Sequence, residues 1–113
     1  MMEPCRGEIW SVNLNPTRGH EQAGIRPALI VSVDAFNHGP AGLVVLLPLT
    51  TKHRGIPFHV EVGSRDGSVK VKSFVKCEDI RSVSKERLVD RWGISSQETM
   101  TQVEDRLRIL LNL

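Results

Sequence analysis

The fold is decided by two short apolar stretches, PALIV at residues 27–31 and LVVLLPL at residues 43–49. Both stretches are continuously apolar, which is typical of strands that are buried on both faces of a sheet. Pro48 lies inside the second stretch, so it indicates an edge, a bulge or the end of that strand. Neither stretch approaches the roughly 20 residues that a membrane-spanning helix needs, so we expect no membrane association.

Shorter patterned segments surround these two stretches. Residues 8–14 and 58–62 alternate between apolar and polar side chains, as half-buried strands do. Residues 69–77 also alternate, with valines on one face and lysines on the other. The Asp66-Gly67 pair before them is a strong signal for a tight hairpin turn. The chain up to this point therefore predicts about five strands in local order.

The periodicity changes after residue 94, where a helix is expected. Ser95 and Glu98 have the spacing of a capping box, in which both side chains satisfy backbone N–H groups at the start of a helix. Apolar residues then recur at helical spacing, at Met100, Val103, Leu107 and Leu110. The predicted fold is mainly β, a small antiparallel barrel with one C-terminal helix.

Length and composition limit the possible functions. A chain of 113 residues fits one domain, over residues 1–113. A net charge of +2 does not by itself indicate a nucleic-acid binder, and an aromatic content of 4% argues against single-strand binding by stacking. Residues 40–77, however, hold six basic and two acidic side chains. This local excess suits a surface that contacts phosphates, although a solvated face has the same composition.

The cysteines and histidines give no metal or cofactor motif. Cys5 and Cys77 lack metal-type spacing and leave both a disulfide and two reduced thiols open. No apolar signal segment follows the N-terminus, so we expect a cytoplasmic protein with reduced thiols. His53 and His59 flank a turn and could meet in space, but surface histidines are the default reading. We expect no cofactor and no metal.

Polar residues at the ends of the two apolar stretches are the candidate site. Arg26 precedes Pro27, which favours an extended conformation and brings the guanidinium out at the strand's mouth. Thr50 closes the second stretch and is followed by further donors and cations, Thr51, Lys52 and Arg54. These side chains could line one pocket that binds an anion. The alternative is that Arg26 pairs with Glu8 or Glu21 and that the threonines only favour strand formation.

Several segments in order resemble the MazF/PemK-type toxins of type II toxin–antitoxin modules, and together they cover nearly the whole chain. They are residues 6–10, 14–22, 26–32, 48–51, 75–83 and 87–88, and the final helix. The resemblance implies the SH3-like barrel with a C-terminal helix that MazF-, PemK- and CcdB-type toxins share. It also implies a homodimer and a cognate acidic antitoxin, whose binding segment becomes ordered on the toxin.

The resemblance further implies an endoribonuclease that cuts single-stranded RNA, such as mRNA, without a metal. The products would carry a 2′,3′-cyclic phosphate and a 5′-hydroxyl. The family's catalytic arginine and threonine fall on Arg26 and Thr50. RNA would be bound by two loops, through His20, Glu21, Gln22, Thr51, Lys52 and Arg54. Arg81, in the family's Ile-Arg segment, would contact RNA or support the site.

Two departures from the family pattern leave questions open. His20 replaces a serine of the family's loop, and Thr51 replaces the serine that commonly follows the catalytic threonine. It is therefore open which hydroxyl acts, and Glu21, His20 and water all remain candidate general bases. His20 and His53 acting as an acid–base pair is a further hypothesis.

Two other functions are compatible with the same fold. One is a toxin that poisons DNA gyrase by docking to it, and the other is an inactive RNA-binding module. The matching Arg26 and Thr50 favour the nuclease, because the gyrase poisons do not need this pair.

Overall fold

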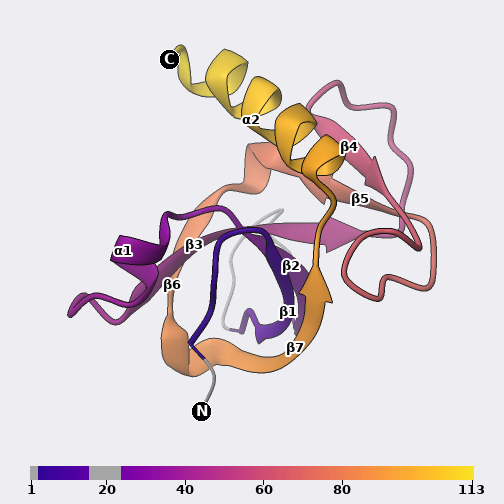
Figure 1. Ribbon diagram of the computed structural model, residues 1–113. Coiled ribbons are helices and arrows are strands. Elements are labelled where there is room, and N and C mark those ends of the chain that lie inside the picture. The colour runs from indigo at the N-terminus through magenta and orange to yellow at the C-terminus, as the bar shows by residue number, and fades with distance from the viewer. Residues whose placement is uncertain (1–2, 16–23) are drawn as a thin grey trace.

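The chain forms an antiparallel sheet with one long helix lying across it (Figure 1). The computed structural model describes residues 3–15 and 24–113. Its strands are β1 (Glu8–Asn13), β2 (Ile25–Ile30), β3 (Leu43–Thr50), β4 (His59–Val62), β5 (Ser73–Lys76), β6 (Arg81–Ser84) and β7 (Leu88–Ile94). The helices are α1 (Asp34–Asn37) and α2 (Gln97–Leu111), with the 3-10 turns η1 (Cys77–Asp79) and η2 (Lys85–Arg87).

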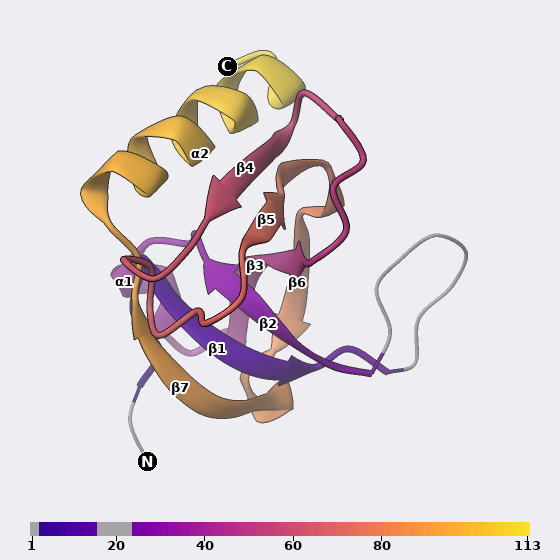
Figure 2. The ribbon, with the colours of Figure 1, turned by 90° about the vertical axis from the view of Figure 1, so that its right-hand side faces the viewer.

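The strands follow the order β4-β5-β3-β2-β1-β7, and β6 pairs with β3 beside β5. β2 and β3 are therefore inner strands, as the two apolar stretches predict. Figure 2 shows the strong curvature of the sheet and α2 running beside β4. Among the described strands, β4 and β7 at the two ends do not pair. The predicted mainly β fold with a C-terminal helix is thus confirmed, and the sheet of the expected small barrel is curved but not closed.

Both faces of the inner strands are buried, in two separate hydrophobic clusters. Leu29 and Leu47 belong to the cluster beneath α2, together with Met100 and Val103 of that helix. Ala28, Ile30 and Leu46 belong to the second cluster, on the other face of the sheet, with Trp10, Val12, Leu14 and Val44. Consecutive residues enter opposite clusters because side chains alternate along a strand. This arrangement explains why the two stretches are apolar without interruption.

The structure has seven strands where the sequence predicts about five. β6 and β7 escape detection because nearly all of their residues are half-buried or exposed, so no apolar pattern marks them. The predicted strand over 69–77 shrinks to Ser73–Lys76. Val62 pairs with Ser73, so residues 63–72 form a loop and not the tight hairpin expected at Asp66-Gly67. Val71 in this loop is 62% exposed.

Asp66 caps α2 from this loop. Its fully buried carboxylate accepts hydrogen bonds from the Ser96 backbone N–H (2.9 Å) and the Ser95 hydroxyl (3.1 Å). The N-cap residue is Ser96, whose Oγ accepts from the Thr99 N–H at 3.2 Å. The predicted capping box at Ser95 and Glu98 is therefore one residue early. Burial raises the pKa of Asp66, but hydrogen bonds from Ser96, Thr99 and neighbouring groups outweigh burial and lower it.

The two cysteines are free thiols, so the disulfide that the sequence left open is not formed. Cys77 is fully buried, and burial raises the pKa of its thiol to about 12. In the described part of the chain, no helix is long and apolar enough to cross a membrane.

Candidate functional site

Arg26 and Thr50 lie at the same end of the adjacent strands β2 and β3. β2 and β3 are antiparallel, with Ala28 opposite Pro48 and Ile30 opposite Leu46. Arg26 and Thr50 lie two positions beyond Ala28 and Pro48, the last paired residues at this end of the two strands. Side chains two positions apart on a strand lie on the same side of the sheet. The two residues that the sequence singles out thus stand at one end of adjacent strands and on the same side of the sheet, and we call them the cross-strand pair.

The surroundings fix the position of this pair. Both residues stand on the sheet face of the second cluster, at the point where its apolar residues end. On its other side Arg26 is paired with Val12 of β1, and Thr50 is paired with Phe74 of β5. Arg26 is exposed and Thr50 is half-buried. Rigid strands on both sides therefore hold two polar groups at a surface that solvent or a ligand reaches.

Hydrogen bonding orients the Thr50 hydroxyl. Its Oγ1 accepts the backbone N–H of Lys52 at 3.2 Å. A threonine hydroxyl has one proton to donate and two lone pairs to accept with. Because this bond uses a lone pair, the proton remains for donation to an acceptor such as a phosphate oxygen. Thr51 points to the opposite face of the sheet and lines a different cavity.

Sequence reasoning misses the aromatic residue beside this pair. Phe74 is buried, although the alternation of residues 69–77 placed it on a basic outer face. The exposed ring of His53 contacts it, with centroids 4.9 Å apart, and the ring of His59 lies at 6.4 Å. His53 and His59 thus gather around Phe74. The available signal was that Phe74 is the one aromatic side chain among the lysines of this segment.

An ionic cluster follows on the same side of the molecule. His59 is 4% exposed, and its Nε2 lies 2.8 Å from Glu78 Oε2. Asp79 pairs with Arg81 at 2.8 Å and with Lys76 at 3.7 Å. Arg81 itself faces Leu46 of β3. It is thus four residues, or about 13 Å, along β3 from Thr50.

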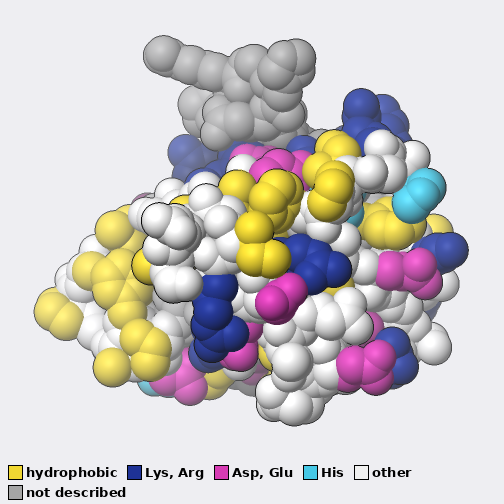
Figure 3. Space-filling view, turned by 90° about the horizontal axis from the view of Figure 1, so that it is seen from above, with side chains coloured by type: hydrophobic (Ala, Val, Ile, Leu, Met, Phe, Trp, Pro, Cys, Tyr) yellow, Lys and Arg dark blue, Asp and Glu magenta, His cyan; other side chains and the backbone are white. Residues whose placement is uncertain are grey.

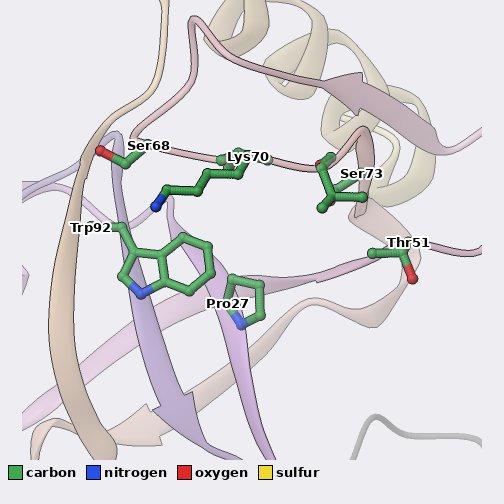
Figure 4. A pocket seen from close by; sticks show the side chains of 8 residues that line it. Pro27, Thr51, Ser68, Lys70, Ser73 and Trp92 are labelled. Carbon is green, nitrogen blue, oxygen red and sulfur yellow. The ribbon is translucent and has the colours of Figure 1, made fainter.

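The opposite side of the β2–β3 pair bears a cavity of about 530 Å³. It is lined by Pro27, Thr51, Ser68, Val69, Lys70, Val71, Ser73 and Trp92. Figure 4 shows the Trp92 indole and the Pro27 ring forming its wall, with Lys70 reaching over from the 63–72 loop. Pro27 and Thr51 directly follow Arg26 and Thr50, so the cavity and the cross-strand pair lie back to back.

Exposed cations surround these two features. In the described part of the chain, no ion pair to another described residue engages Lys52, Arg54 or Lys70. Figure 3 shows hydrophobic patches interspersed with charges of both signs on the face seen from above, the side of α2. Lys52, Arg54 and Lys70 are therefore the part of the positive excess of residues 40–77 that can meet a charged ligand. Lys72 and Arg65 are paired with Glu61 and Glu98.

The remaining predicted site residues, His20, Glu21 and Gln22, lie outside the described residues, and so does the suggested Arg26–Glu21 pair. The alternative partner Glu8 is otherwise engaged. Its carboxylate pairs with Arg91 at 2.6 Å and accepts the Trp10 indole N–H at 3.0 Å. Burial raises the pKa of Glu8, but these bonds and the Cys5 N–H outweigh burial and lower it.

Comparison with known proteins agrees with this architecture. A family model described as PemK-like, MazF-like toxin of type II toxin-antitoxin system matches residues 5–111. The chain belongs to this family. Its curated relatives include Endoribonuclease EndoA of Bacillus subtilis, 31% identical over 96% of this chain and 94% of the relative. Endoribonuclease MazF9 of Mycobacterium tuberculosis is 34% identical over 96% of both chains.

Solved structures of the family superpose closely on this chain. MazF from Deinococcus radiodurans is 30% identical and covers all of both chains, with a TM-score of 0.88. An endoribonuclease from a mycobacterial species, in complex with its cognate antitoxin, is 29% identical with a TM-score of 0.80 and covers 100% of this chain and 97% of its own. The family's fold, including its curved sheet and terminal helix, is thus the fold of this chain.

Proposed function

We propose that this chain is the toxin of a type II toxin–antitoxin module and cuts single-stranded RNA, including mRNA, in the cytoplasm. The observation that carries the proposal is that Arg26 and Thr50 stand at the same end of the paired strands β2 and β3, on one side of the sheet. It is supported by membership of the toxin family and by relatives that are named endoribonucleases. Cleavage of mRNA would stop translation and growth.

The reaction is an attack by the RNA 2′-hydroxyl on its own neighbouring phosphorus. The bond from phosphorus to the 5′-oxygen breaks, which leaves a 2′,3′-cyclic phosphate and a 5′-hydroxyl. Negative charge accumulates on the phosphoryl oxygens in the transition state. Catalysis therefore needs donors aimed at those oxygens, a base for the 2′-hydroxyl and a proton for the leaving oxygen.

Arg26 is suited to the first task. The planar guanidinium donates two parallel hydrogen bonds to a phosphate and remains charged at neutral pH. The exposure of Arg26 and its fixed place on β2 support this role. Thr50 adds a second donor, because its Oγ1 already accepts from Lys52 N–H and keeps its proton for the ligand.

The proton steps fall to other groups. A base drawn from Glu21, His20 or water would take the 2′-proton, as the sequence leaves open. The exposed His53, seated on Phe74, is a further candidate to exchange a proton near Thr50. The RNA strand would pass along the exposed 51–57 loop, where Lys52 and Arg54 meet its phosphates.

The partners follow from the remaining surface. We place the antitoxin's acidic segment at the cavity lined by Trp92 and Pro27, with one of its apolar side chains inside and its carboxylates near Lys70. A second copy of the chain would cover further apolar surface, since Ile109, Leu111 and Leu113 are exposed at the end of α2.

The direct test incubates the purified protein with total RNA in the presence of EDTA and sequences the fragment ends. We expect discrete cuts with 5′-hydroxyl ends. Arg26→Ala should lower the cleavage rate by about 10²–10³, the usual effect of losing a preorganised oxyanion donor. Arg108→Ala removes another exposed arginine, from α2, and should leave the rate unchanged.

Three outcomes would overturn the proposal. Wild-type rates in a folded Arg26→Ala protein would remove the assigned site. Intact RNA together with trapped gyrase–DNA complexes would identify the gyrase poison, and RNA binding without any cleavage would identify an inactive module.

A further inference from the structure

The fold gathers three metal-binding side chains at the end of β2 and β3 away from Arg26 and Thr50. They are Cys5, Asp34 and His38, and their ligand atoms all lie within 4.8 Å of one another. Cys5 Sγ is 3.7 Å from His38 Nε2. This separation is close to the edge of a tetrahedron built on Zn–S and Zn–N bonds of about 2.3 and 2.0 Å. In the described part of the chain it is the only such group of three.

Each ligand is already held near the required position. Asp34 Oδ1 accepts the Arg6 N–H at 2.6 Å and the Asn37 side-chain amide at 3.3 Å, so the carboxylate is oriented and neither bond uses Oδ2. His38 Nε2 lies 2.8 Å from the Pro4 carbonyl oxygen. A carbonyl oxygen only accepts, so Nε2 donates this hydrogen bond when no metal ion is bound. Binding of an ion takes the other tautomer, with the proton on Nδ1, so that the Nε2 lone pair faces the ion beside Cys5 Sγ. The Pro4 carbonyl oxygen is then available as the fourth ligand.

The electrostatics around Cys5 favour a cation. The carboxylates of Glu8 and Asp34 act on the Cys5 thiol, and they do not favour a negative charge there unless a cation balances it. A metal ion that binds a thiol displaces its proton. The carboxylates that oppose the thiolate attract a divalent ion to the same place.

We propose that Cys5, Asp34 and His38 bind one Zn²⁺ ion, which fastens the N-terminal segment to α1. A set of one thiolate, one imidazole and one carboxylate is borderline-soft chemistry, which suits zinc more than magnesium or calcium. The spacing of the ligands in the sequence gives no sign of the site, because Asp34 and His38 are 29 and 33 positions after Cys5. They come together only in the fold, where α1 follows β2 and lies against residues 4–6.

The experiment titrates the full-length protein, stripped with a chelator, with zinc ion alone. We expect one ion per chain by calorimetry and a raised Tm. Cobalt ion alone should give a thiolate-to-metal charge-transfer band in the near ultraviolet. Cys5→Ser should abolish that band, and His38→Gln and Asp34→Asn should each weaken zinc affinity by at least about tenfold.

His53→Gln is the matched control, since it removes another exposed histidine and should leave zinc affinity unchanged. Circular dichroism of each variant without metal reports whether it remains folded. The proposal is overturned by the absence of the cobalt band, or by a zinc affinity that Cys5→Ser and His38→Gln do not change. RNA cleavage in EDTA is measured separately, so failure of the zinc site and failure of the nuclease assignment give different results.

Discussion

Replacing Asp66 by alanine should destabilise the fold far more than its place in a surface loop suggests. The carboxylate is fully buried and accepts the backbone N–H groups of Ser96 at 2.9 Å and Gly63 at 3.3 Å, besides two serine hydroxyls. The hydroxyls can turn to new partners, but the two N–H groups cannot. At about 1.5–3 kcal/mol for each of these two charge-assisted bonds, the loss is about 3–6 kcal/mol.

This free energy converts into a large change of melting temperature. An unfolding entropy of about 2.1 cal/mol/K per residue gives about 0.24 kcal/mol/K for a chain of this length, so Tm should fall by about 12–25 °C. Thermal unfolding followed by circular dichroism at one fixed protein concentration measures it. Asp66→Asn preserves the shape and one acceptor oxygen and should lose less than Asp66→Ala.

Glu98→Gln is the control, because the capping box predicted from the sequence would make Glu98 the capping carboxylate. Its side chain is 60% exposed and pairs at 3.2 Å with an equally exposed Arg65. Such a pair contributes little, so Tm should move by less than about 2 °C. A fall of equal size in Glu98→Gln, or a Tm for Asp66→Ala within about 3 °C of wild type, would refute the reasoning.

The pH dependence of the same variants gives an independent check. The folded-state pKa of Asp66 is lowered, so its stabilisation is present above the unfolded-state pKa of about 3.9. The stabilisation is lost as the pH falls through the lowered folded-state value. Acid unfolding curves should therefore be steeper for wild type than for Asp66→Asn, and parallel curves would contradict this.

Three further predictions concern the site and the sheet. Thr50→Ser should retain most RNA cleavage while Thr50→Val loses at least about tenfold, because only the hydroxyl proton is used; equal rates in a cleavage assay would exclude this role. Glu8→Gln should cost about 1.5–3 kcal/mol in denaturant unfolding through its bond to Arg91, and a similar midpoint to wild type would contradict it. Gly93→Ala should lower Tm by several degrees, because a Cβ would lie 2.9 Å from the Gly67 Cα; an unchanged Tm would show that the loop yields freely.

The inner part of the sheet was predictable because burial on both faces leaves a continuous apolar signal. β2 and β3 carry that signal, and the structure confirms them as inner strands within two residues of the predicted ends. β7 carries none, since five of its seven residues are exposed. Asp66-Gly67 wrongly predicted a tight hairpin turn, because Asp66 instead caps the N-terminus of α2, which is distant in the sequence. No pattern in the sequence around Asp66 indicates its contact with residues 95 and 96.

The candidate site was predictable in its residue types but not in its geometry. An arginine before one strand and a threonine closing another identify two strand ends, and only the pairing of β2 with β3 brings these ends to the same place. Phe74 joins the site through a separate pairing of β3 with β5, which the sequence alone does not specify. The resemblance to the toxin family named Arg26 and Thr50 together from the sequence, but it gave no place in the sheet for either residue.

The two ends of the β2–β3 pair carry different groups of functional side chains. This separation decides what a zinc ion would change in the protein. Arg26 and Thr50 stand where the strands leave the second cluster, whereas α1, with Asp34 and His38, joins the strands at their other end. Most residues between the two ends are buried, so the two paired strands act as a rigid body. A zinc ion at Cys5 would therefore raise stability without altering the positions of Arg26 and Thr50. Since binding shifts an equilibrium only through differential affinity for its states, the ion should change how long the toxin remains folded and leave its cleavage rate per folded molecule unchanged.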